Sequence, residues 1–348
     1  MLKHCNEQSR IDHYIFKLDG VKSAAQDYDQ ALVIETEEET YRSACVKCAK
    51  PQCVSYFDDE FICEGVADFA ANLDDRVCPT RSIRWSEQTN EFEIDQSSCI
   101  SCGLCAMRCP FGAIYKSREG LMTINKDRSS YRYELIPFDS DPAELQSECS
   151  EAIATLTSSR KHHRADIERI ELIYQSIALD NEIANILCRN LIIESGWNCS
   201  VRRIGDVYTR MDAIFEGNGA YGVVEIEYDA DTLSSARNLL DDLAMLQTRY
   251  SLPARETIPV ALCMSIPNTR QGYFQVCEDI RNVLGIKIRT LTVGALLALV
   301  WAGAELEFGD DSFCLGFRDT SIKDDIELII GGSIEDDKVT LGIYDSAK

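Results

Sequence analysis

The sequence predicts two successive domains: a small, cysteine-rich α+β domain and a larger α/β domain with a mixed sheet. Three observations lead to this expectation. Eight of the 16 cysteines fall into two spaced motifs between residues 45 and 109. From residue 160 onward, helical periodicity alternates with short strand-like runs. A chain of 348 residues is long enough for two domains with ordinary cores.

Composition predicts where these domains begin and end. Residues 1–44 are mixed and end in an acidic run, so we expect an N-terminal extension packed on the cysteine-rich domain, which spans residues 45–126. Residues 127–159 are polar and contain Pro137 and Pro142, which is typical of a linker with one short helix after Pro142. Residues 160–348 form the second domain with a C-terminal extension.

The cysteine spacing predicts iron–sulfur clusters. One run reads Cys99-x2-Cys102-x2-Cys105-x3-Cys109-Pro110, and the other joins Cys45-x2-Cys48-x4-Cys53 to a separate Cys78-Pro79. Three closely spaced thiolates wrap one face of a cubane, and the fourth cysteine of each run ligates the other cluster. We therefore expect two [4Fe–4S] centres. Their ligand sets are Cys99, Cys102, Cys105 with Cys78, and Cys45, Cys48, Cys53 with Cys109.

Two alternatives remain open for these cysteines. Cys63 lies inside the segment 54–77 and is a rival ligand for Cys53 or Cys78. Zinc also accepts Cys-x2-Cys pairs, although the x2-x2-x3 order followed by proline favours iron–sulfur. With its exit Cys109-Pro110-Phe111-Gly112-Ala113-Ile114, the stretch 45–114 resembles the bacterial two-[4Fe–4S] ferredoxins. Its first half, Cys48 to Cys53, is more similar to iron–sulfur subunits of molybdopterin oxidoreductases. The insertion 54–77 departs from both patterns.

The elements of the second domain follow from hydrophobic periodicity and from glycine caps. We expect helices at 167–177, 183–191, 233–247 and 273–284, and an apolar helix after Val293. Gly196 marks the end of the second helix, and Gly285 caps the fourth. We expect strands at 201–204, 210–215, 222–228, 259–266 and 286–290.

A hairpin in this domain carries the candidate chemistry. Asn218-Gly219 favours a type I′ turn, because that turn needs positive φ at both central residues. Counting back from the turn places Asp212 opposite Glu225 and Arg210 opposite Glu227, with the three acids on one face. Opposed carboxylates repel unless a proton or cation lies between them. The pattern therefore indicates a site for Mg²⁺ or Mn²⁺, which bind carboxylate oxygens.

Residues 165–304 resemble the PD-(D/E)XK restriction-endonuclease-like superfamily. The resemblance implies that Asp212 and Glu225 bind the metal and that Glu182 on the upstream helix assists. It also places Glu227 at the position where the family usually has Lys. Two less specific interpretations compete with catalysis: Glu227 pairs with Arg210 across the hairpin, or the domain has the nuclease shape without the activity.

Charge and targeting patterns limit the partners. The net charge is −23, with 16 basic against 27 acidic side chains in residues 1–150 and 19 against 31 in the rest, so neither half is a basic nucleic-acid arm. DNA binding then needs a partner protein that supplies basic surface. Basic residues at 161–164 and 202–203 are phosphate contacts or a solvated face. The sequence shows no export signal, and the apolar stretch 293–304 is too short to span a bilayer, so we expect a cytoplasmic chain without membrane contact.

Three functions are compatible with the sequence. The first is a metal-dependent DNA endonuclease of phage restriction, defence or repair, acting within a complex and carrying iron–sulfur clusters that stabilise it or gate it by redox state. The second is a ferredoxin-type electron-transfer subunit with a redox partner, whose second domain docks that partner. The third is a catalytically inactive, nuclease-like subunit.

Overall fold

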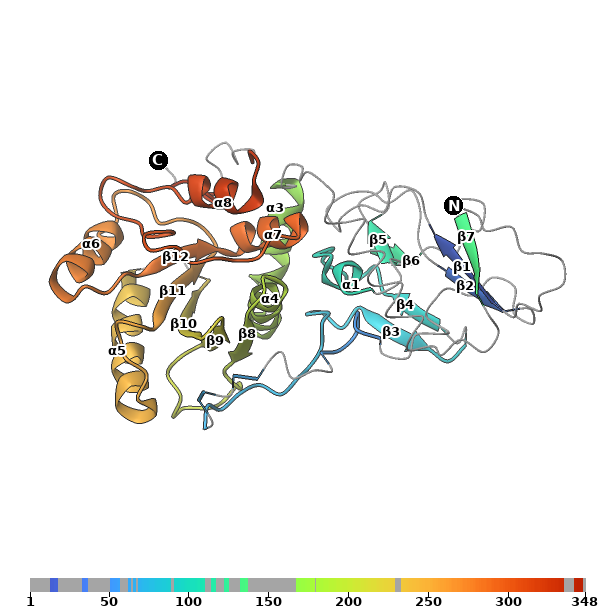
Figure 1. Cartoon of the computed structure of the whole chain (residues 1–348), viewed down its shortest axis with the longest axis horizontal. Coiled ribbons are helices and arrows are strands. Elements are labelled where there is room, and N and C mark those ends of the chain that lie inside the picture. The colour runs from blue at the N-terminus through green and yellow to red at the C-terminus, as the bar shows by residue number, and fades with distance from the viewer. Residues whose placement is uncertain are drawn as a thin grey trace. The chain divides into compact units, whose positions relative to one another are not determined.

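The structure is a computed structural model of the chain (Figure 1). It describes residues 13–17, 33–36, 51–56, 62–63, 65–66, 68–88, 91–109, 114–116, 122–124, 132–136, 167–178, 180–228, 233–334 and 341–346. The chain divides into unit 1, residues 1–57 and 75–161, and unit 2, residues 58–74 and 162–348. Residues 58–74 therefore leave the expected cysteine-rich domain and belong to the second unit.

Unit 1 contains a three-stranded antiparallel sheet in the order β2-β1-β7, formed by β1 (His13–Lys17), β2 (Val33–Thr36) and β7 (Arg132–Ile136). This sheet corrects the expected boundaries. β7 lies in the stretch 127–159 that we expected to be a linker, and it pairs with β1 from the N-terminal extension. The helix expected after Pro142 lies outside the described residues.

The cysteine-bearing part of unit 1 consists of two hairpins and a short helix. The hairpins are β3 (Ile83–Ser86) with β4 (Glu91–Ile94) and β5 (Ile114–Lys116) with β6 (Met122–Ile124), and the helix is α1 (Leu104–Met107). The two ends of the insertion meet here, because Val77 N donates to Val54 O (2.9 Å) and Tyr56 N donates to Asp75 O (2.9 Å).

Unit 2 is built on a mixed sheet, as the sequence predicts. The sheet has five strands in the order β12-β11-β10-β9-β8. The strands are β8 (Asn198–Val201), β9 (Ala213–Gly217), β10 (Ala220–Glu227), β11 (Ile258–Cys263) and β12 (Arg289–Thr292). β10, β11 and β12 are parallel, and β8, β9 and β10 are antiparallel neighbours. A mixed sheet of this kind buries both faces under helices.

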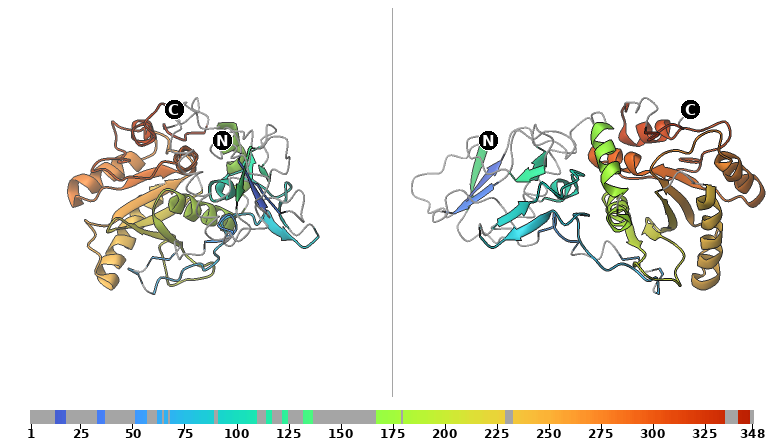
Figure 2. Two further views of the ribbon diagram at one scale, coloured as in Figure 1. Left: turned by 45° about the vertical axis from the view of Figure 1, so that its right-hand side comes forward. Right: turned by 180° about the vertical axis from the view of Figure 1, so that it is seen from behind.

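Helices cover both faces of this sheet (Figures 1 and 2). α5 (Leu233–Tyr250) packs on β10 and β11 and is followed by α6 (Tyr273–Leu284). α4 (Asn181–Glu194) and α7 (Val293–Ala302) pack on the opposite side, flanked by α3 (Ile167–Ile177) and α8 (Lys323–Ile330). α7 is buried along its whole length, and no helix in the described part of the chain is both long and apolar enough to cross a membrane.

Local chemistry explains the helix ends. Asp180 caps α4, because its Oδ1 accepts the backbone N–H groups of Glu182 (2.9 Å) and Ile183 (3.3 Å). Thr292 caps α7 through Ala295 N (3.0 Å). Gly285, at φ 71°, ends α6 in the left-handed conformation that favours glycine.

The structure confirms most of the expected elements and shifts three of the strands, one of which, expected at 210–215, is observed at Ala213–Gly217. α3 and α6 have the bounds that periodicity predicts. The strand expected at 201–204 is observed at Asn198–Val201, and the strand expected at 286–290 is observed at Arg289–Thr292. Trp197 is a core residue, and its indole N–H donates to Leu306 O (2.8 Å).

Residues 62–74, which we call the strap, lengthen the β8 edge of the sheet in unit 2 (Figure 1). Asn72 N donates to Val201 O (2.8 Å), Arg203 N donates to Ala70 O (2.8 Å), and Ala71 bridges Arg202 in antiparallel fashion. The strap therefore satisfies backbone groups at an edge that would otherwise remain open.

Candidate functional site

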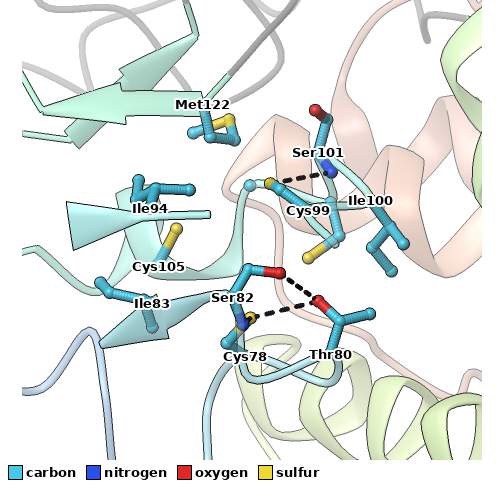
Figure 3. Close-up of a pocket in the computed structure, with 12 residues that line it drawn as sticks. Cys78, Thr80, Ser82, Ile83, Ile94, Cys99, Ile100, Ser101, Cys105 and Met122 are labelled. Atoms are coloured by element: carbon cyan, nitrogen blue, oxygen red, sulfur yellow. Dashed lines mark hydrogen bonds between the residues drawn. The ribbon is translucent and has the colours of Figure 1, made fainter. Parts of the chain in front are cut away.

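Four cysteines of unit 1 line one cavity, as the spacing predicts. Cys78 precedes β3, Cys99 and Cys102 follow β4, and Cys105 lies in α1; the space that they surround has a volume of about 310 Å³ and is partly open to solvent (Figure 3). Positive φ angles at Ser101 (55°) and Gly103 (86°) turn the backbone between the thiols. Apolar side chains close the cavity: Ile83, Ile94, Ile100 and Met122.

Besides the sulfur atoms, the polar lining of the cavity comes from Thr80, Ser82 and Ser101. Ser82 N donates to Cys78 Sγ (3.1 Å), and Ser101 N donates to Cys99 Sγ (3.4 Å). Such N–H···S bonds stabilise thiolates and tune the potential of clusters bound to them. The pKa of Cys105 lies well above its ordinary value because of burial and of the nearby sulfurs of Cys102 and Cys78, in that order.

This donor set fits a cube of iron and sulfide better than a single ion. Four soft thiolates around a cavity satisfy the ligand requirement of a [4Fe–4S] cluster. Within the described residues, no three Cys, His, Asp or Glu side chains converge closely enough to hold one metal ion. Zinc, the alternative, takes four such ligands around a single ion.

The expected second ligand set is only partly described. Cys53 and Cys109 are both buried, and the residues preceding them are joined, because Arg108 Nε donates to Gln52 O (3.0 Å). The Arg108 guanidinium also lies 4.1 Å from the centre of the Tyr56 ring. These contacts bring the two chain segments together. Cys45, Cys48 and Pro110 lie outside the described residues.

Cys63, the rival ligand, lies in the strap and is buried within unit 2. Its thiol donates to Ile214 O (3.4 Å) and Asn198 O (3.6 Å), and its backbone N–H donates to Ser200 Oγ (3.2 Å). Burial is the main cause that raises the pKa of Cys63 to about 12. A protonated, hydrogen-bonded thiol of this kind has a packing role, which removes Cys63 from the candidate cluster ligands.

The second candidate site, which we call the carboxylate cluster, comprises Asp212, Glu225, Glu227 and Asp242 in unit 2. The hairpin has the expected register: Asn218 (φ 52°) and Gly219 (φ 78°) form the turn, and β9 pairs with β10 from Ala220↔Gly217 to Val224↔Ala213. The next positions in that register are Asp212 and Glu225.

Asp212 is held by two donors. Its Oδ1 accepts from the Arg202 guanidinium (3.1 Å), and its Oδ2 accepts from Ile226 N (3.0 Å). Burial still raises the pKa of Asp212 above its ordinary value, although the hydrogen bond of Ile226 and the charge of Arg202 oppose this shift. Asp212 is therefore oriented by the fold itself.

Glu225 and Asp242 repel their acidic neighbours. Burial first, and then the charge of Asp212, raises the pKa of Glu225 to about 8, although Asn238 Nδ2 donates to its Oε1 (2.7 Å). Asp242 lies on α5, is 2% exposed, and has a pKa raised to about 7 by burial and then by Asp212. Near neutral pH, the cluster needs a shared proton or a cation.

Sequence reasoning missed Asp242, although a signal for it exists. It lies at helical spacing from the buried residues Leu239, Leu243 and Leu246, so an acid occurs on the apolar face of an amphipathic helix. Arg202 was expected as a phosphate contact or as part of a solvated face, and its contact with Asp212 depends on tertiary structure.

The other predicted site residues do not all join the carboxylate cluster. Arg210 pairs with Asp241 (2.9 Å) on the surface, which differs from the expected alternative partner Glu227. Glu227 adds to the repulsion that raises the pKa of Glu225. Glu182 is half-buried in the first turn of α4, whereas Asn185 of that helix reaches the sheet by hydrogen bonding to the Tyr228 hydroxyl. Residues 161–164 lie outside the described part.

Comparison with known proteins identifies the cysteine-rich region. Residues 92–115 match the 4Fe-4S binding domain family. Hydrogenase-4 component A of Escherichia coli (strain K12) is 45% identical over 42 residues, which is 12% of this chain and 20% of that protein. The chain thus matches about a fifth of this relative's length. This chain contains a [4Fe–4S]-binding domain and binds an iron–sulfur cluster.

Two solved structures of the restriction endonuclease FokI resemble the chain weakly. One has a TM-score of 0.32 and 14% identity, covering 57% of this chain and 38% of FokI. The other, FokI bound to DNA, has a TM-score of 0.30 and 15% identity, covering 64% and 39%. The chain spans less than half of that protein, and a likeness at these scores identifies no function.

Proposed function

We propose that this chain is a two-[4Fe–4S] protein whose unit 2 hydrolyses DNA phosphodiester bonds with a divalent cation. The observation that carries the proposal is the carboxylate cluster, in which Asp212 and Glu225 follow the last pair of the hairpin register, Val224↔Ala213, and repel each other. Acids that face one another in a half-buried site are the ligands that Mg²⁺ and Mn²⁺ use, together with water and phosphate oxygens.

In this proposal, Asp212 and Glu225 bind the cation directly or through water. Bound Mg²⁺ supplies a water of lowered pKa and stabilises charge on the departing oxygen. The protein orients the ligands, because Ile226 N and Arg202 fix Asp212 while Asn238 fixes one oxygen of Glu225. Glu227, two residues along β10, is the proposed proton acceptor, with Glu182 as a helper.

The net charge of the chain is the reason for proposing a protein partner. A chain with net charge −23 is repelled by DNA phosphates, so we propose that a partner protein contributes basic surface within a complex. Restriction of phage DNA and DNA repair are the cytoplasmic processes in which such a complex would act.

The test is an anaerobic cleavage assay on plasmid and linear DNA with Mg²⁺ or Mn²⁺. We expect Glu225→Gln to abolish cutting and Asp241→Asn, the exposed neighbour of Asp242, to retain it. Absence of cutting by the intact iron-loaded chain together with its co-purifying partners would overturn the hydrolase proposal.

Electron transfer is the second candidate, and the matched segment of hydrogenase-4 component A favours it. In that case, unit 2 docks a redox partner. Reduction of the clusters by a donor protein, with turnover unaffected by Glu225→Gln, is the outcome that supports this function over hydrolysis. Iron and sulfide analysis is expected to find about eight iron atoms per chain for two clusters.

A further inference from the structure

Asp242 is a buried acid without a compensating partner. It is 2% exposed, and its Oδ2 is fully buried without a hydrogen-bond partner in the described part of the chain. Burying a carboxylate in this way is costly unless a cation or a proton compensates for it. The fold therefore keeps an acid at this position at the expense of stability, as functional sites do.

The charged groups around Asp242 come from three elements. The acids are Asp212 before β9, Glu225 on β10 and Asp241 on α5 itself. The nearest arginines already bind other acids: Arg202 binds Asp212 (3.1 Å), and Arg210 binds Asp241 (2.9 Å). Asp242 therefore faces surplus negative charge.

Helix α5 also directs the side chain of Asn238 at Glu225. Asn238 lies one turn before Asp242, and residues at i and i+4 share a helix face. Asn238 Nδ2 donates to Glu225 Oε1 (2.7 Å), which fixes one oxygen of Glu225. This face of α5 thus brings Asp242 close to the charges of both Asp212 and Glu225.

We propose that Asp242 is a ligand of a divalent cation, Mg²⁺ or Mn²⁺, which it shares with Glu225. Two carboxylates and several waters make a complete site for such a hard cation. No three acids in the described residues converge on one point, and both oxygens of Asp212 already accept hydrogen bonds, so Asp212 contacts the cation through water. This inference deepens the proposed function, on which it rests for the role of the cation.

The test measures Mn²⁺ binding to the full-length, iron-loaded chain without DNA, at about 0.15 M KCl to suppress loose association with the acidic surface. The EPR signal of free Mn²⁺ reports binding. We expect one tight site in the wild-type chain, a loss of affinity of at least about tenfold in Asp242→Asn, and less than a twofold change in Asp279→Asn, a matched control at an exposed aspartate of α6.

A second measurement excludes misfolding as the cause. Asp242→Asn is isosteric and removes a buried charge, so it should unfold at the same or a higher temperature in EDTA while losing the stabilisation that Mn²⁺ gives to the wild-type chain. Unchanged Mn²⁺ affinity in Asp242→Asn, or absence of a tight site in the wild-type chain, overturns the inference. Tight binding that requires Asp242, in a chain that cuts no DNA, supports the inference and overturns the hydrolase proposal.

Discussion

Without metal, unit 2 should become less stable as the pH rises from about 5 to 7. Glu225 and Asp242 have folded pKa values of about 8 and about 7, raised from the ordinary values of 4.5 and 3.8. Between the unfolded and folded pKa values, the folded state holds a proton that the unfolded chain has released. Unfolding then becomes more favourable as the pH increases. The stability that these two protons contribute is complete below the pKa values of the unfolded chain, and it is lost as the pH rises through this window.

The size of the effect follows from proton counting. Each proton held only by the folded state contributes about 1.4 kcal/mol per pH unit. Glu225 is partly exposed, and its pKa shift arises partly from the charge of Asp242, so we count the two groups as about one proton. From about pH 5.5 to 7, the expected loss is about 2 kcal/mol, which lowers the melting temperature of a unit of this size by about 4–8 °C.

The assay is thermal unfolding in EDTA at several pH values, followed by far-UV circular dichroism under anaerobic conditions. Asp242→Asn should flatten the dependence, whereas Asp279→Asn, a control at an exposed aspartate of α6, should keep the wild-type slope. An equal slope in wild type and Asp242→Asn would show that Asp242 does not hold a proton in the folded state, and a rise in stability over this window would refute the reasoning altogether.

Two further predictions concern packing and the cluster ligands. A Cβ atom at Gly222 would lie 1.9 Å from the Phe215 ring, so Gly222→Ala should lower the free energy of unfolding by about 1–3 kcal/mol in urea titrations; an unchanged midpoint would contradict this packing. Cys78→Ser should lose about half of the iron, whereas Cys63→Ser, whose thiol packs within unit 2, should keep it all; iron loss in Cys63→Ser would restore Cys63 as a ligand.

Local signals account for what the sequence predicts well. The turn residues Asn218 and Gly219 determine the register of the β9–β10 hairpin, and Asp212 and Glu225 are the positions that follow its last pair, Val224↔Ala213. The four cysteines around the cavity follow from motif spacing in the same way, because a loop of that length presents its thiols to one centre.

Nonlocal contacts account for what the sequence does not predict. β12 begins at Arg289, whose guanidinium donates to the carbonyl oxygens of Ser312 (2.8 Å) and Asp310 (2.9 Å), far along the chain. β7 pairs with β1 across more than a hundred residues. Asp242 joins the carboxylate cluster only because α5 packs against β10. In each case, the deciding partner is absent from the local sequence.

The strap has a consequence for how the chain can be divided. It begins and ends between Cys53 and Cys78, which belong to unit 1, yet it pairs with β8 of unit 2 at residues 201–203. A fragment that starts at residue 160 would lack the strap, open the β8 edge and remove the partner of Arg202. Since Arg202 also holds Asp212, such a cut would disturb the carboxylate cluster. The iron–sulfur region and this cluster therefore depend on one continuous chain, which a single boundary cannot separate.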